Sequence, residues 1–172
     1  MKRISITSLL LLFLSGCTGV PAGVTTVDGF DLERYLGRWY EIARLDHSFE
    51  RGLEKVSAHY SLRDDGGVRV VNRGYSPRDR EWREAEGRAW FVADSDTGHL
   101  KVSFFGPAYA SYVIFELDRD GYQHAFVAGY DRSYLWLLAR TPEVDRALIE
   151  RFVARSRELG FDTDALVFVK HD

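Results

Sequence analysis

Asp46, His47 and Ser48 are the first residues to weigh for chemistry, because a carboxylate, a histidine and a serine together form a hydrolytic triad. In such a triad the histidine takes the serine proton and the carboxylate orients the histidine. Folding brings triad members together, whereas three consecutive residues of an extended chain point in different directions. We therefore predict no catalytic residue and a protein that is not an enzyme.

The sequence also gives little support for a metal or cofactor site. The chain has 5 histidines and 1 cysteine, and no two histidines stand at metal-ligand spacing. Gly66 and Gly67 fall in a turn between predicted strands, which is not the setting of a phosphate-binding loop. A net charge of −3 does not favour nucleic-acid binding. We expect no metal, no cofactor and no nucleic-acid partner.

The single cysteine, Cys17, ends an export signal. Lys2 and Arg3 precede an apolar run over residues 4–14, which is too short to span a membrane. A lone cysteine can form no internal disulfide, so it needs another use. The run Leu14-Ser15-Gly16-Cys17 resembles the bacterial lipoprotein box, in which the chain is cut before the cysteine and the cysteine carries diacylglycerol and palmitate.

The lipoprotein resemblance sets the expected organisation of the chain. Thr18 follows the cysteine where aspartate would imply the inner membrane, so the resemblance implies a lipid anchor in the outer membrane, on its periplasmic side. We expect a signal peptide at 1–16, a loose lipidated tether at 17–26 and one folded domain at 27–172.

Period-two alternation of apolar and polar residues predicts strands through most of this domain. The connections are short, which makes consecutive strands antiparallel neighbours. Eight such strands can close into an up-and-down barrel with room for one small ligand. The predicted strands lie at 38–45, 56–62, from 68 onward, 83–93, 100–106, 111–118, 122–129 and 134–140.

One helix should follow the strands and brace the barrel wall. Thr141 is a plausible N-cap, Pro142 fits the first helical position and Gly160 marks the stop. A short final strand is predicted at 166–169. The predicted fold class is therefore all-β, an eight-stranded antiparallel barrel with one C-terminal α-helix and a short last strand.

Three motifs in this order resemble those of the lipocalin family. Gly37, Trp39 and Tyr40 match its first signature, Asp131 lies in a turn like its second, although Tyr130 replaces the usual threonine, and Arg140 matches its third. Residues 35–44, 49–56 and 101–107 look most like the bacterial outer-membrane lipoprotein lipocalins. The resemblance implies that Trp39 fills the closed end of the barrel with Arg140 across its ring, a cation–π contact.

Strand parity gives the expected ligand-binding residues, counted from an inward Arg140 and from the apolar side of each strand. A fully packed core would show the same alternation, but small residues at Ala85, Gly87 and Ala89 should leave open volume. The expected lining is Val56, Ala58, Tyr60, Val70, Asn72, Leu100, Val102, Phe104, Tyr112, Ile114, Glu116, His124, Phe126, Tyr134 and Trp136.

A mostly apolar interior with a few polar groups suits an amphiphile. The resemblance implies a single-chain lipid, lysophospholipid or fatty acid, held for storage, transport or maintenance of envelope lipids. One alternative is another hydrophobic ligand such as a tetrapyrrole, with His124 as the candidate contact. The other is a partner-binding envelope protein, including a homodimer that covers the outward-facing Trp90 and Phe105.

Overall fold

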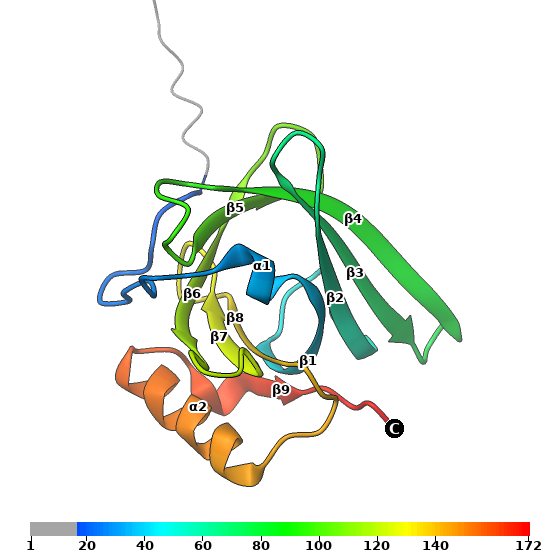
Figure 1. The fold of residues 1–172 in the computed structure, drawn as a ribbon. Helices are drawn as coiled ribbons and strands as arrows, with labels where there is room; N and C mark the ends of the chain where they lie inside the picture. Colours follow the sequence, from blue (N-terminus) through cyan, green and yellow to red (C-terminus); the bar gives the residue numbers. More distant parts are fainter. Residues whose placement is uncertain (1–16) are drawn as a thin grey trace, which may run out of the picture.

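The computed structural model describes residues 17–172, so the predicted signal peptide at 1–16 lies outside the described residues. Within the described chain, no helix has both the length and the apolar character needed to cross a bilayer. Nine strands form one continuous sheet that wraps into a barrel (Figure 1). The elements are α1 (Leu32–Tyr35), β1 (Gly37–Leu45), β2 (Glu54–Leu62), β3 (Val68–Ser76), β4 (Glu81–Phe91), β5 (His99–Ser103), β6 (Ala110–Leu117), β7 (His124–Ala128), β8 (Leu135–Ala139), α2 (Arg146–Glu158), the 3-10 turn η1 (Thr163–Ala165) and β9 (Leu166–Phe168).

Strand β1 closes the barrel because it pairs with two partners. Its first half is antiparallel to β2, with Trp39 opposite Ala58, and its second half is antiparallel to β8, with Arg44 opposite Trp136. Strands β2 to β8 pair in sequence order, and β9 adds to the last residues of β1. The predicted eight-stranded antiparallel barrel, C-terminal helix and short last strand are confirmed.

The antiparallel order gives the barrel two different ends. Helix α1 lies across one end, which we call the closed end (Figure 1). Four connections meet at the other end, which we call the mouth, because each follows a strand that runs away from the closed end. They are residues 46–53, 77–80, 104–109 and 129–134.

Helix α2 packs on the outside of the barrel (Figure 1). It begins later than predicted, since Asp145 rather than Thr141 is its N-cap and the Thr141 hydroxyl instead donates to the Glu143 carbonyl at 2.7 Å. Phe152 is fully buried and meets the ring of Phe126 edge-on, with 5.0 Å between centroids. The wall beneath α2 is therefore apolar on both faces, which two separate buried clusters confirm.

The segment 17–26 is held against the barrel and is not the loose tether that its composition predicts. The Ser111 amide donates to the Cys17 carbonyl at 2.9 Å, and the Ser111 hydroxyl donates to the Gly19 carbonyl at 2.6 Å. Val24 is buried in the outer cluster, and the Arg132 guanidinium donates to the Ala22 carbonyl. These partners lie on the barrel and are distant in the sequence, so local composition could not predict the contacts.

Candidate functional site

Trp39 and Arg140 form a plug at the closed end. Trp39 is fully buried and its Nε1 donates to the Tyr35 carbonyl at 2.7 Å. The Arg140 guanidinium carbon lies 3.9 Å from the Trp39 ring centroid. Arg140 also donates to four backbone carbonyls within 2.8–3.2 Å, those of Arg34, Leu36, Arg38 and Tyr122. The arrangement ties α1 and the connection between β6 and β7 to the ends of β1 and β8.

The other motif residues support the backbone. Gly37 adopts φ 95°, a conformation that favours glycine, and a Cβ there would lie 3.4 Å from Arg140 Nη1. Asp131 accepts a hydrogen bond from the Ser133 amide at 2.8 Å within the β7–β8 turn. Tyr40 points outward and meets the ring of His171 edge-on.

Most of the predicted lining residues face the barrel interior. Asn72 lies opposite Ala58, and Val56 borders Gly74 on the same inner face. Tyr134 stacks on Trp136 near the mouth, with 6.1 Å between ring centroids. The interior cluster and the residues packed on it include Ala58, Tyr60, Val70, Leu100, Val102, Phe104, Tyr112, Ile114 and Trp136.

Several of these inward side chains are only partly buried. Ala58, Val102, Phe104 and Trp136 all retain solvent-accessible surface, although the sheet around them is closed. Ala58, Val102 and Trp136 are on the inward parity of their strands and Phe104 follows β5 at the mouth, so their exposed side-chain surface faces the interior or the mouth. The interior is therefore not packed to exclude water.

The small residues of β4 leave less open volume than predicted. A Cβ at Gly87 would lie 2.8 Å from the ring of Phe104, so that side chain occupies the space beside Gly87. Ala89 is buried, whereas Ala85 is exposed on the inward parity of the strand, opposite Asn72. Open space on this strand lies at Ala85, nearer the mouth.

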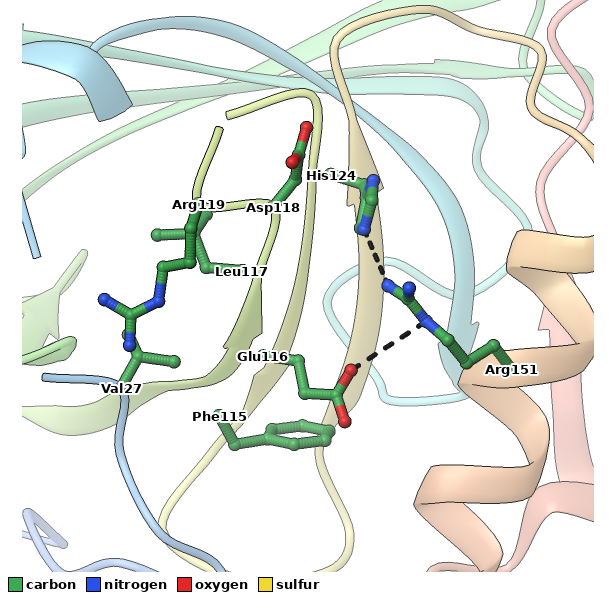
Figure 2. Close-up of a pocket in the computed structure, with 8 residues that line it drawn as sticks. All are labelled: Val27, Phe115, Glu116, Leu117, Asp118, Arg119, His124 and Arg151. Carbon is green, nitrogen blue, oxygen red and sulfur yellow. Dashed lines mark hydrogen bonds and ion pairs between the residues drawn. The ribbon is translucent and has the colours of Figure 1, made fainter. Parts of the chain in front are cut away.

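Glu116, His124 and Phe126 are outside the barrel, so their assignment to the interior was wrong. Figure 2 shows Glu116 and His124 directed at Arg151 of α2, with 3.9 Å from Arg151 Nε to Glu116 Oε2 and 2.7 Å from Arg151 Nη2 to His124 Nε2. Burial and the nearby Arg151 lower the pKa of His124. These residues line an external groove of about 400 Å³, and Phe126 packs under α2.

Two features of the wall explain the error. A register shift between Ile114 and Glu116 reverses the parity of β6, so Ile114 faces inward and Glu116 outward. In β7 both faces are buried, since Ala125 and Val127 face the interior and Phe126 faces α2. Apolar character therefore could not distinguish the two faces of β7.

Three tyrosine hydroxyls meet inside the barrel above the plug. Tyr112 Oη lies 2.7 Å from Tyr35 Oη and 3.0 Å from Tyr60 Oη. Burial raises the pKa of all three, so they are neutral donors and acceptors at physiological pH. The parity rule found Tyr60 and Tyr112 but missed Tyr35, which lies on α1.

A buried charged network lies further toward the mouth, and sequence reasoning missed it. Arg44 Nη1 donates to Glu41 Oε1 at 2.7 Å, and Arg44 Nη2 donates to the Glu50 carbonyl at 2.9 Å. Glu50 Oε2 lies 2.8 Å from His47 Nε2 and accepts from Trp136 Nε1 at 3.2 Å. All four charged or titratable side chains are more than nine-tenths buried. Alternate residues of a strand share a face, so an inward Trp39 places Glu41 on the inner face as well. This alternation could have pointed to Glu41 from the sequence.

The two carboxyls of this network are unequal. Burial and then the charge of Glu50 raise the pKa of Glu41 well above its usual value. Burial alone would raise the pKa of Glu50 as well, but the imidazole of His47 and the Trp136 indole lower it overall. The surroundings thus favour the charged form of Glu50 and the neutral form of Glu41. Arg44 Nε and His47 Nδ1 are buried without a hydrogen-bond partner.

The stretch Asp46-His47-Ser48 does not assemble a triad. His47 is buried and faces Glu50, while Asp46 and Ser48 are exposed and Asp46 accepts from Arg51 Nε at 2.7 Å. Across residues 17–172 no group of three or more metal-ligating side chains comes together.

Comparison with known proteins identifies what the barrel resembles. Residues 30–171 match the family model described as a lipocalin-like domain. The chain is 57% identical over 162 residues to the outer membrane lipoprotein Blc of Vibrio cholerae serotype O1, covering 94% of this chain and 95% of that protein. It is 52% identical over 150 residues to the protein of the same name from Escherichia coli K12, covering 87% and 84% of the two chains.

Solved structures agree on the fold. Insecticyanin from the tobacco hornworm Manduca sexta superposes with a TM-score of 0.71 over 90% of this chain and 87% of its own, at 18% sequence identity. At that identity the likeness concerns the barrel architecture alone.

Proposed function

We propose that this chain, which belongs to the lipocalin family, is an outer-membrane lipoprotein that holds one single-chain amphiphile, a lysophospholipid or a fatty acid, inside its barrel. It would store, transport or maintain envelope lipids. The lipocalin relatives and the barrel support a carrier of small hydrophobic ligands, and the choice of a single-chain lipid is our own step. The relatives in Vibrio cholerae and Escherichia coli are named as outer membrane lipoproteins, which supports the same location and an anchor on Cys17.

The observation that carries the proposal is the partly exposed apolar interior of a closed barrel. Ala58, Val102, Phe104 and Trp136 present apolar surface that water reaches from inside. Covering such surface with an acyl chain is favourable by roughly 25 cal/mol per Å². Eight strands leave room for one small ligand, which favours one chain over two.

The polar groups indicate how the amphiphile would lie. The network of Glu41, Arg44, His47 and Glu50 is on the mouth side of the interior, so a polar head would lie at this end of the barrel. The tail would then extend toward Tyr60 and the plug. A head near the mouth also keeps part of its hydration, which lowers the cost of burying it.

A pair of variants on β4 tests the interior as the binding site. Ala85 faces inward and is exposed, so Ala85→Trp should fill open space without displacing packed atoms. Glu84 is exposed on the opposite face of the same strand, so Glu84→Trp is the matched control. We expect Ala85→Trp to weaken lysophosphatidylethanolamine binding at least tenfold, measured by titration followed through tryptophan emission, and Glu84→Trp to leave it within twofold.

Equal affinity of both variants would contradict the proposal, provided that each has the urea midpoint of the wild type. Loss of binding in the Glu84 variant alone would move the site to the outside of the barrel.

The structure bears on the two alternatives, a tetrapyrrole carrier and a partner-binding protein. A tetrapyrrole stays an alternative because of the fold, but His124, its candidate contact, lies outside the barrel against Arg151. Self-association stays a prediction, and sedimentation across a dilution series would measure it. Trp90 is partly buried, and Tyr109 meets its ring edge-on with 6.0 Å between centroids.

A further inference from the structure

The loop between β5 and β6 presents an apolar tip at the mouth. Its residues Phe104-Phe105-Gly106-Pro107-Ala108-Tyr109 carry no charge, and the four from Phe105 to Ala108 are all exposed. Phe105 is 79% exposed, the highest value among the large apolar side chains of the described residues. Runs of exposed apolar residues are avoided on soluble surfaces unless they have a use.

The tip is held in this position by its base. The buried Ser103 donates from its hydroxyl to the Gly106 carbonyl at 2.9 Å, and Gly106 adopts φ 59°. Tyr109 folds back toward Trp90 and lies 5.3 Å from the Lys101 ammonium. The loop therefore turns Tyr109 onto the barrel and Phe105 away from it.

Cys17 lies directly beside this loop. It forms a parallel bridge to Ala110, the first residue of β6, and the Ser111 amide and hydroxyl fix the carbonyls of Cys17 and Gly19. Only Tyr109 lies between Ala110 and the exposed Ala108 in the chain. Acyl chains on Cys17 would thus leave the protein next to the apolar tip, with no free segment that could let the barrel turn away.

A second mouth loop carries another exposed aromatic side chain. Phe49, in the loop between β1 and β2, is 58% exposed and packs one face on His47, with 3.9 Å between ring centroids. Both loops follow strands that run away from the closed end, so Phe49 and Phe105 project at the same end of the barrel.

We infer that the mouth docks on the lipid bilayer, with Phe105 and the tip around it inserted among the lipids beside the Cys17 anchor. The inference rests on the anchor in the proposed function. Its consequence is that the interior opens onto the membrane, so a single-chain lipid can pass between leaflet and barrel without crossing water. Anchoring by acyl chains alone would fix the distance to the membrane, whereas the tip fixes the orientation.

Fluorophore labelling of the full lipidated chain in phosphatidylethanolamine and phosphatidylglycerol vesicles tests the orientation. Phe105→Cys places a label at the mouth, and Leu62→Cys is the matched control, since Leu62 is a 54% exposed apolar residue at the end of β2 next to the closed end. We expect nitroxide-bearing lipid to quench the label at 105 at least threefold more than the label at 62, and iodide in the water to show the reverse order.

Three results would overturn the inference. Stronger lipid quenching at 62 than at 105 would mean that the closed end faces the bilayer. Iodide quenching at both positions would mean that the whole barrel lies away from the bilayer. Protection of position 105 from both quenchers would mean that protein covers the tip, as in a dimer. Vesicle flotation of the wild type tests the anchor separately, and a chain that fails to float contradicts both proposals. If the chain floats and binds lysophospholipid but the label at 105 is exposed to water, only the docking of the mouth on the bilayer is contradicted.

Discussion

At the residue scale, one strand carries both the plug and the charged network. Trp39, Glu41 and Arg44 follow one another on the inner face of β1, from the closed end toward the mouth. The first closes the barrel with apolar volume, and the other two are hydrogen-bonded to each other, with Arg44 also donating to the Glu50 carbonyl. The same short stretch of sequence thus has a structural end and a polar end.

Trp39→Ala should lower the free energy of unfolding by about 3–5 kcal/mol, because it leaves a large cavity and strands Arg140 without its ring contact. Urea denaturation measures the change. A variant with an unchanged urea midpoint and lost ligand binding would show that Trp39 contacts ligand and is not a plug.

Glu41→Gln should change how stability depends on pH. The pKa of Glu41 is raised in the folded protein, so folding takes up a proton above the unfolded pKa of about 4.3. Its contribution to stability is complete below that pH and is lost as pH rises toward the folded pKa, by at most about 1.4 kcal/mol per pH unit.

The amide variant has no such proton to lose, so its stability relative to the wild type should rise with pH above 4. Urea unfolding of both proteins at a series of pH values gives the difference directly. Parallel curves for the two proteins would show that Glu41 has the same pKa folded and unfolded.

At the element scale, the strands could be predicted but the faces of two of them could not. Alternation in β2 and β3 was clear because polar residues such as His59 and Arg69 face solvent there. Helix α2 covers the outside of β6 and β7, which removes that contrast. The bulge after Ile114 is a matter of pairing with β7, so no pattern within β6 alone announces it.

The role of α2 as a brace gives an element-scale prediction. Phe152→Ala should cost about 3–5 kcal/mol of stability, since the side chain is fully buried against Phe126. Ligand affinity should stay within twofold, because this contact is outside the barrel. Arg146→Ala is the control on the same helix, with a 91% exposed side chain and a stability change of about 0.5 kcal/mol or less. A large loss of affinity in folded Phe152→Ala would instead couple the helix to the interior.

At the scale of the whole molecule, the closed end and the mouth have different roles. The plug, α1 and α2 stabilise a barrel that is closed at one end, and the network around Glu50 and the apolar tip at Phe105 lie at the other. The overall architecture followed from the alternation, the short turns and the three motifs. The charged network did not, because buried charges are found only where tertiary contacts pair them.

Native mass spectrometry of the lipidated wild-type chain tests whether the barrel holds one single-chain lipid. The protein is exchanged into a mild volatile detergent and then titrated with lysophosphatidylethanolamine. We expect a saturable complex with one lysophospholipid per barrel, and far weaker binding of the two-chain phosphatidylethanolamine. A barrel that takes up neither lysophospholipid nor fatty acid, or that binds several molecules without saturating, would contradict it.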